Sequence, residues 1–260
     1  MIPRVLIVAG SDSGGGAGIQ ADVKTVTMLG GHAATAITAL TAQNTLGVQG
    51  VHPVPAEFVV AQMESVLGDI GADAVKIGMI GAPATARAVA DVLERVSVPI
   101  VFDPVMVATS GAVLADCATI AAFARLMRLA TVVTPNLPEL EALGGEEAVL
   151  AHGCHLVVKG GHADGPTVVD RLLAPDGREL ARHEGERIDT TSTHGTGCTF
   201  ASALATQLAG GAPIDEAFRD AVRFVRAALL AAPGLGEGHG PIGHALGRDP
   251  FAELEGRCPD

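Results

Sequence analysis

The sequence Thr193-His194-Gly195-Thr196-Gly197-Cys198-Thr199, followed by a run of small residues to Gly210, shapes the interpretation of the whole chain. Two glycines allow a tight turn that brings the backbone close to a ligand. A helix that begins there presents unpaired N–H groups and the positive end of its dipole, which together bind anions. Cys198 lies in the first turn, where we expect its pKa to fall from ~8.5 towards neutrality. The same pattern also fits a plain helix cap with a buried, inert cysteine.

Composition restricts the class of protein. The chain has 260 residues, of which 48% are hydrophobic and 18% charged, and no linker-like segment divides it, so we expect one α/β domain over residues 1–260. No apolar run reaches the ~18 residues that a membrane-spanning helix needs. The net charge of -12 and the absence of Trp and Tyr argue against nucleic acid as a partner. Four cysteines without CxxC spacing indicate free thiols and a cytoplasmic protein.

Short apolar segments alternate with helical patterns along the chain. Strands are predicted over residues 5–9, 34–40, 74–77, 99–102, 131–133 and 156–159, with a hairpin formed by 168–173 and 179–183. Helices are predicted over residues 18–29, 55–67, 83–94, 115–129, 138–143, 199–210 and 214–232. Repeated strand–helix units predict a mostly parallel sheet covered by helices on both faces. Ligands of such sheets bind beyond the carboxyl ends of the strands, so the residues that follow each strand matter most.

Three segments near the first strands suit a small organic ligand. The glycine-rich loop from Gly10 to Asp22 matches neither a P-loop nor the dinucleotide fingerprint, but it can wrap a ligand with its backbone. Gln43 carries a donor and an acceptor that suit a nitrogen-containing ring, and Met79 offers an adaptable apolar wall. Each has a structural alternative: a tight loop, an amide that stabilises a turn, and a core methionine.

The later strand ends carry groups that suit phosphate and metal chemistry. Asp103 follows the fourth strand, where its carboxylate can face Mg²⁺ or a nucleotide. Asn136 and Glu139 are three residues apart and share one face of a helical turn, an arrangement that fits either a hydrated Mg²⁺ or a capping box. Lys159 places a cation where phosphates would lie, or else is an exposed lysine before a turn.

Taken together, these motifs resemble the ribokinase superfamily, and within it the hydroxymethylpyrimidine/phosphomethylpyrimidine kinases of thiamine biosynthesis. The resemblance runs from about Val5 to His244. The most specific segments are residues 14–22, 38–45, 76–79, 103–105, 134–139, 158–162 and 194–199. The family implies a three-layer α/β/α sandwich, commonly a homodimer, that uses ATP and Mg²⁺. It implies phosphorylation of the hydroxymethyl group of 4-amino-5-hydroxymethyl-2-methylpyrimidine and then of the monophosphate. Whether a monovalent cation is also needed is left open.

The resemblance also implies roles for individual residues. Around the pyrimidine it implies Gly10, Asp22, Gln43, Met79 and Val105. Around the nucleotide it implies Asp103, Asn136, Lys159 and Thr196, and near the metal Asp103, Asn136 and Glu139. The catalytic set is Gly195, Gly197, Lys159 and Cys198, with Cys198 standing where many superfamily members carry an aspartate base.

Two features depart from the family pattern. The first loop reads Ser13-Gly14 where many members have Pro-Ser, and we expect no fused thiamine-phosphate synthase module after Gly240.

Two alternative functions remain open. Pyridoxal kinases of vitamin B6 salvage are the nearest alternative, because some share the cysteine motif. A non-catalytic pyrimidine sensor is a second alternative, which the intact Asp103, Asn136, Glu139 and Lys159 argue against.

Overall fold

A single mixed sheet organises the computed structural model, which describes residues 1–107, 111, 114–162 and 165–247. Nine strands lie in the order β3-β2-β1-β4-β5-β6-β7-β8-β9. The strands are β1 (Arg4–Asp12), β2 (His32–Asn44), β3 (Gly47–Pro53), β4 (Ala74–Ile77), β5 (Ile100–Phe102), β6 (Val132–Val133), β7 (His155–Val158), β8 (Thr167–Leu173) and β9 (Glu179–Glu186). From β2 to β7 all neighbours run parallel, whereas β3, β8 and β9 join antiparallel at the two edges.

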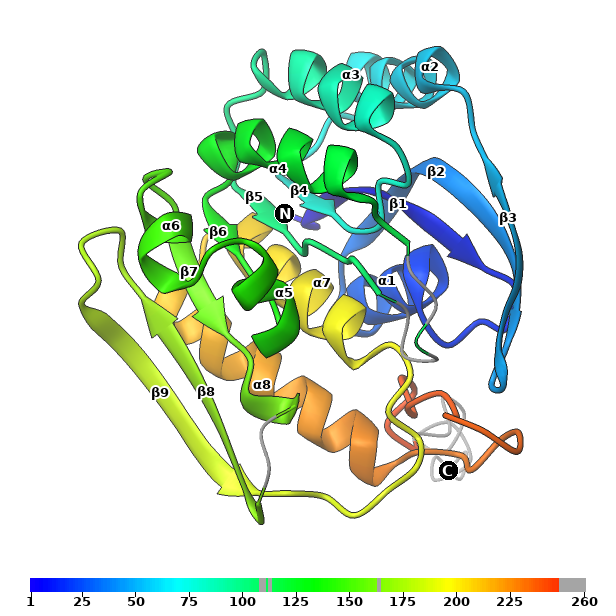
Figure 1. The fold of residues 1–260 in the computed structure, drawn as a ribbon, viewed down its shortest axis with the longest axis vertical. Helices are drawn as coiled ribbons and strands as arrows, with labels where there is room; N and C mark the ends of the chain where they lie inside the picture. Colours follow the sequence, from blue (N-terminus) through cyan, green and yellow to red (C-terminus); the bar gives the residue numbers. More distant parts are fainter. Residues whose placement is uncertain (108–110, 112–113, 163–164, 248–260) are drawn as a thin grey trace, which may run out of the picture.

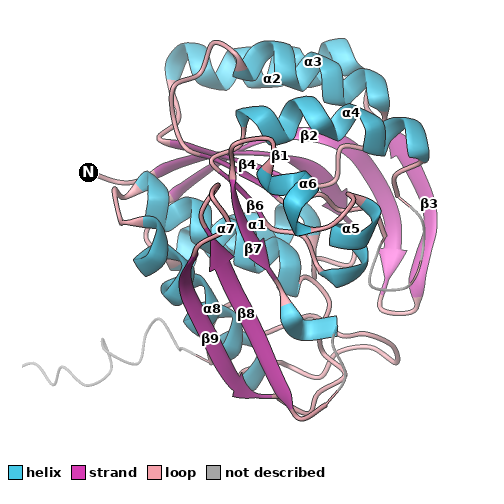
Figure 2. Cartoon of the chain, turned by 60° about the vertical axis from the view of Figure 1, so that its left-hand side comes forward, coloured by secondary structure: helices cyan, strands magenta, loops and turns pink. Residues whose placement is uncertain are grey.

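Helices cover both faces of this sheet (Figures 1 and 2). The helices are α1 (Gly18–Met28), α2 (Ala56–Asp69), α3 (Pro83–Leu93), α4 (Cys117–Leu129), α5 (Leu137–Ala142), α6 (Glu146–Leu150), α7 (Thr196–Ala209) and α8 (Ile214–Leu230). Alternate strand residues point to opposite layers: Leu6 and Val8 pack with α2, α3 and α4, while Val5 and Ile7 pack with α1, α7 and α8. The predicted three-layer α/β/α sandwich is therefore confirmed.

Strand β2, beside the glycine-rich loop that follows β1, is longer than the sequence predicts. β2 continues to Asn44, so Gln43 lies within a strand rather than after one, and β3 pairs with this extension. Strand β3 was not predicted, because its sequence Gly-Val-Gln-Gly-Val-His-Pro is glycine-rich and unlike a typical strand. In the structure most of its residues are exposed. Together the end of β2 and β3 form a two-stranded arm beside the carboxyl end of β1 (Figure 1).

Helix α7 begins three residues earlier than predicted, at Thr196, with Gly195 as its N-terminal cap residue. Cys198 therefore lies in the first turn, as the motif suggested. Among the described residues, Cys117, Cys154 and Cys198 are free thiols, while Cys258 lies outside them. Within that same part of the chain, no helix is long and apolar enough to cross a membrane.

Candidate active site

A cavity of about 910 Å³ lies beyond the carboxyl ends of the parallel strands, at the N-terminus of α7. Most of the predicted site residues line it: Gln43, Asp103, Val105, Asn136, Glu139, Lys159, Gly195, Thr196, Gly197 and Cys198. These residues come from the carboxyl ends of four strands, β2, β5, β6 and β7, and from the beginning of α7. Gly10, Asp22 and Met79 are not among the lining residues. The structure thus brings together the predicted phosphate and metal groups, but only part of the predicted pyrimidine site.

The turn before α7 requires glycine for two separate reasons. Gly195 has a φ of 89°, a left-handed conformation that other residues rarely adopt. A Cβ at this position would lie 1.9 Å from the carbonyl oxygen of Gly16, so the glycine-rich loop after β1 packs directly on the turn. The first turn of α7 faces the cavity with the backbone N–H groups of Gly197 and Cys198, which is the geometry of an anion site, whereas the N–H of Thr196 donates to the carbonyl of Thr193 at 3.4 Å.

A buried hydrogen bond between Asp12 and His194 joins the two glycine-rich loops. The Oδ2 atom of Asp12 accepts a hydrogen bond from Nε2 of His194 at 2.8 Å, and also from the backbone N–H groups of Gly16 and Ala17. Burial opposes the charge on Asp12, but His194 and the backbone donors outweigh it and lower the pKa of the carboxyl. Neither Asp12 nor His194 was predicted from the sequence to have a role in the site. An aspartate two residues before Gly14 was the available signal, because Asp side chains commonly accept backbone N–H groups in such loops.

Asp103 and Lys159 form the charged centre of the cavity wall. Nζ of Lys159 lies 2.9 Å from Oδ1 of Asp103, and the hydroxyl of Thr134 donates to the same oxygen at 3.1 Å. The Lys159 side chain is only 15% exposed, so the alternative of an exposed surface lysine is wrong. Burial opposes its charge, yet Asp103 and Glu139 prevail and raise the pKa of Lys159. Lys159 is therefore a fixed cation facing the cavity.

Asn136 and Glu139 form a capping box at the start of α5. The side-chain oxygen of Asn136 accepts from the Glu139 N–H, and a Glu139 oxygen accepts from the Asn136 N–H, both at 2.9 Å. The structural alternative for this pair is thus present, within the same cavity as Asp103. Burial, and then the charge of Asp103, raise the pKa of Glu139 to about 7 despite nearby Lys159. A bound cation would relieve this unfavourable grouping of carboxylates.

Gly10, Gln43 and Met79 lie around the arm formed by β2 and β3. A Cβ at Gly10 would lie 2.1 Å from the terminal carbon of Met79, so β1 and Met79 are in close contact. The hydroxyl of Thr41 donates to Oε1 of Gln43 at 3.2 Å, and the Gln43 amide lies 3.4 Å from the His194 ring. Gln43 is thereby held at the cavity edge next to the turn that precedes α7.

Asp22 occupies a different environment from the one expected. Its side chain is fully buried in α1, where both carboxylate oxygens accept from Nζ of Lys76 at 2.8 Å. Ser202 of α7 donates a further hydrogen bond to Asp22 at 2.7 Å. The carboxylate therefore lies beneath the cavity and is not part of its wall. The geometry favours a supporting role for Asp22 over direct contact with a ligand. The signal that the sequence analysis missed was Lys76, a lone charge inside an apolar strand.

The expected acidity of Cys198 is wrong. Burial raises the pKa of its thiol to about 12, although the charge of Lys76 and the backbone N–H of Gly18 act in the opposite direction. The loss of solvent around the sulfur outweighs the helix N-terminus on which the prediction relied. At neutral pH the side chain is therefore a thiol, and its thiolate form depends on the charges around it.

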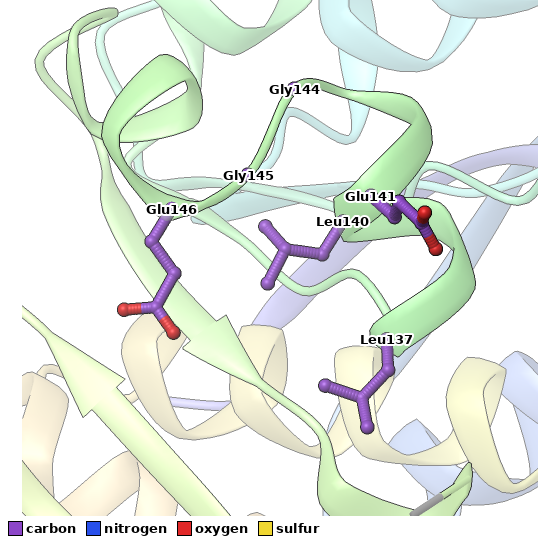
Figure 3. Close-up of a pocket in the computed structure, with 6 residues that line it drawn as sticks. All are labelled: Leu137, Leu140, Glu141, Gly144, Gly145 and Glu146. Carbon is purple, nitrogen blue, oxygen red and sulfur yellow. The ribbon is translucent and has the colours of Figure 1, made fainter.

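A second hollow lies between α5 and α6 (Figure 3). Its lining consists of Leu137, Leu140, Glu141, Gly144, Gly145 and Glu146. The two leucines and two carboxylates drawn in Figure 3 bring no cation to this hollow. It therefore lacks the groups that the larger cavity offers to a phosphate.

Comparison with known proteins identifies the family to which the chain belongs. The sequence profile of phosphomethylpyrimidine kinase matches residues 12–243, which is most of the chain. The chain belongs to this family. The resemblance inferred from the motifs is confirmed.

Individual relatives of the family match over almost the whole chain. A hydroxymethylpyrimidine/phosphomethylpyrimidine kinase from Rhizobium meliloti is 48% identical over 261 residues, covering 94% of this chain and 97% of the relative. A thiamine biosynthesis bifunctional protein from Geobacter sulfurreducens is 49% identical and covers 93% of this chain. The chain spans only 52% of the length of that bifunctional relative.

Solved structures of two kinds resemble this fold. An ADP complex of Bacillus subtilis pyridoxal kinase has a TM-score of 0.85 at 32% identity, covering 95% of this chain and 98% of the other. A phosphomethylpyrimidine kinase from Clostridium difficile has a TM-score of 0.75 at 34% identity, covering 88% of this chain and 99% of the other. The fold thus accommodates both vitamin kinases named here.

Proposed function

We propose that this protein transfers the γ-phosphoryl group of ATP to the hydroxymethyl group of 4-amino-5-hydroxymethyl-2-methylpyrimidine, and then to the resulting monophosphate. The observation that carries this proposal is a single cavity that holds the N-terminus of α7, Cys198 and the Asp103–Lys159 pair. An anion site, a proton acceptor and a fixed cation are the groups that phosphoryl transfer to an alcohol needs. Membership of the family and the names of its relatives support the substrate.

The substrate side of the cavity suits a small polar ring. Gln43 reaches the cavity edge with an amide that offers both a donor and an acceptor, and Val105 adds apolar surface. Met79 packs on Gly10 directly behind this edge and supports it. We therefore assign Gln43 and Val105 to contact with the pyrimidine, and Gly10 and Met79 to the wall behind it. Asp22 supports the site from beneath.

The nucleotide side holds the charges. Lys159 faces the phosphates, and the backbone of Gly197 and Cys198 in the first turn of α7 supplies N–H donors. Thr196 lines the cavity beside them, while its own N–H donates to the carbonyl of Thr193. No group of three or more His, Cys, Asp or Glu side chains in the described ranges forms a ready metal site. Mg²⁺ in kinases is typically held by one or two carboxylates together with the phosphates, so Asp103 and Glu139 suffice, with Asn136 beside them. Bound there, the ion would neutralise developing phosphate charge.

The transfer step pairs one proton movement with one phosphoryl movement. The substrate hydroxyl oxygen forms a bond to the γ-phosphorus while the bond to the ADP oxygen breaks. Cys198 first releases its thiol proton to solvent, because the thiol is its form at neutral pH. The hydroxyl proton of the substrate then passes to the thiolate sulfur, which restores the thiol. The N–H groups between Gly195 and Cys198 stabilise the charge on the transferred group. Because only the thiolate accepts a proton, the acidity of Cys198 matters for the rate.

The decisive experiment measures ATP consumption and product masses with hydroxymethylpyrimidine and pyridoxal in parallel. We expect mono- and diphosphate products from the pyrimidine, and ATP turnover only when the pyrimidine is present. Pyridoxal phosphate as the main product would instead assign the protein to vitamin B6 salvage, an alternative that the similarity to pyridoxal kinase structures makes worth testing. Pyrimidine binding without turnover would favour a sensor. Light scattering on the same sample tests the homodimer that the family implies.

A further inference from the structure

Lys76 is a charged residue in a position that normally holds an apolar one. It lies in the central strand β4, between Val75 and Ile77, and its side chain is fully buried. Its neighbours Val75 and Ile77 pack with the layer of α2, α3 and α4, so Lys76 points to the opposite layer, towards α1 and α7. A buried lysine in such a place requires a partner of opposite charge.

That partner is Asp22, and the pair is tightly fixed. Both Asp22 oxygens lie 2.8 Å from Nζ of Lys76, and Ser202 donates to one of them at 2.7 Å. Gly78 gives the ammonium group room, since a Cβ there would lie 2.8 Å from Nζ. Buried ion pairs contribute little to stability compared with apolar residues of the same size. Stability alone therefore does not account for a salt bridge at this depth.

The position of the pair relative to Cys198 suggests a role. Ser202 follows Cys198 by four residues in α7, and Asp22 follows Gly18 by four residues in α1, so each couple shares one helix face. The N–H of Gly18 interacts with the Cys198 sulfur, and Asp22 binds Ser202 one turn further along both helices. The Lys76–Asp22 pair therefore lies one helical turn beneath the Cys198 sulfur.

Four charged groups face Cys198 from the surrounding elements. Lys76 of β4 and Lys159 after β7 are positive, whereas Asp22 of α1 and Asp103 after β5 are negative. Burial raises the pKa of the thiol most, and among the charges Lys76 has the largest effect and lowers it. Asp22 opposes Lys76 with a smaller effect, so the pair as a whole lowers the pKa of the thiol, while burial raises it more.

We propose that Lys76 is a positioning residue whose ammonium group, held by Asp22 and Ser202, favours the thiolate of Cys198. The salt bridge keeps a positive charge beneath the sulfur without exposing it to the cavity. The consequence for catalysis rests on the proposed function, in which this thiolate accepts the substrate proton. The effect on the thiol itself does not depend on that function.

The test replaces the ion pair by neutral side chains of similar size, Asp22→Asn with Lys76→Met. Alkylation of Cys198 by iodoacetamide is followed by peptide mass spectrometry from pH 7 to pH 10, without substrate. We expect the rate at Cys198 to fall about threefold to tenfold below that of the unmodified protein at each pH. Loss of one opposing charge shifts a neighbouring pKa by about one unit or more, and the simultaneous loss of Asp22 offsets part of that shift. The matched control Ser202→Ala removes one hydrogen bond but no charge, and should change the rate by less than about twofold.

Cys154 serves as an internal reference in every sample. Burial raises the pKa of Cys154 to about 11, and its thiol donates to the carbonyl oxygen of Val149 at 3.5 Å. The alkylation rate of Cys154 should therefore stay constant. A rise in the alkylation rate of Cys154 would reveal unfolding of the variant. In that case the variant Asp22→Asn with Lys76→Gln, whose neutral side chains can form a hydrogen bond, replaces the first one. An unchanged Cys198 rate in a folded neutral variant would overturn the proposal.

Pyrimidine phosphorylation by the same variants separates this inference from the proposed function. A parallel fall in alkylation rate and in kcat supports both. A fall in alkylation with unchanged kcat keeps the role of Lys76 towards the thiol and removes Cys198 as the base. A fall in kcat with unchanged alkylation refutes the role of Lys76.

Discussion

Replacing Gly195 by alanine tests whether the turn before α7 is the anion site. A Cβ at Gly195 would lie 1.9 Å from the carbonyl oxygen of Gly16, whereas ordinary contacts begin at 3.4 Å. One of the two loops must therefore move by about 1.5 Å, the difference between those distances. The loop at Gly16 is anchored by Asp12, so the movement falls largely on the turn that carries the N–H donors.

Two effects of this substitution can be separated with a matched control. Alanine in a left-handed conformation costs about 1–2 kcal/mol wherever it is placed. Gly211, just after the other end of α7, has a φ of 85° and no atom within 4 Å of its added Cβ. Gly211→Ala should therefore show the conformational effect alone, a loss of about 1–2 kcal/mol, with activity unchanged. Gly195→Ala should add the displacement of the turn.

The assay is kcat for the phosphorylation of hydroxymethylpyrimidine, together with urea unfolding of both variants. A misplacement of about 1 Å, or the loss of one donor to a developing oxyanion, lowers turnover by about 10²-fold or more. We expect Gly195→Ala to lose at least that factor while remaining folded. If Gly195→Ala retained kcat within about threefold of Gly211→Ala, the N-terminus of α7 would not be the site that stabilises the transferred group.

Three further predictions concern single side chains. Cys198→Ala should lower kcat by about 10²- to 10⁴-fold with little change in thermal unfolding, and full activity would remove Cys198 as the base. Asp12→Asn places an amide N–H against backbone donors, so urea unfolding should show a loss of about 1–3 kcal/mol, whereas Asp176→Asn in an exposed turn should show almost none. Burial, and then the charge of Lys24, lower the pKa of His244 to about 4, below its value in the unfolded chain. Between those pKa values only the unfolded chain binds the proton, so stability should fall by about 2 kcal/mol from pH 7 to pH 5. His244→Gln should flatten that pH dependence in urea unfolding, and an unchanged slope would assign it to other groups.

The fold was largely predictable because its signals are local. Apolar strands such as Val5 to Val8 and the helices between them repeat with clear spacing, and glycine or proline marks most boundaries. Because ligands bind beyond the carboxyl ends of parallel strands, the sequence alone places Asp103, Asn136 and Lys159 at one edge of the sheet. The structure brings these three side chains into one cavity.

The parts that the sequence did not reveal depend on distant neighbours. β3 has no strand-like composition and forms only because β2 extends to pair with it. Asp12 and His194 are 182 residues apart, and nothing in either segment indicates their contact. The high pKa of Cys198 follows from burial of its sulfur, whereas its position at a helix start suggested the opposite direction.

Asp22 shows what a motif leaves open, because a motif does not say whether a carboxylate faces a ligand or another side chain. Lys76 belongs to a different motif, and only the pairing of β1 with β4 brings the two residues together. A charge in the middle of an apolar strand is rarely accidental, because its burial must be compensated by a partner. An isolated charge in an apolar strand, together with an acid in a helix that packs on the same face of the sheet, is therefore a sequence signal for a buried ion pair. Lys76 and Asp22 carry this signal, and they lie beneath the thiol of Cys198.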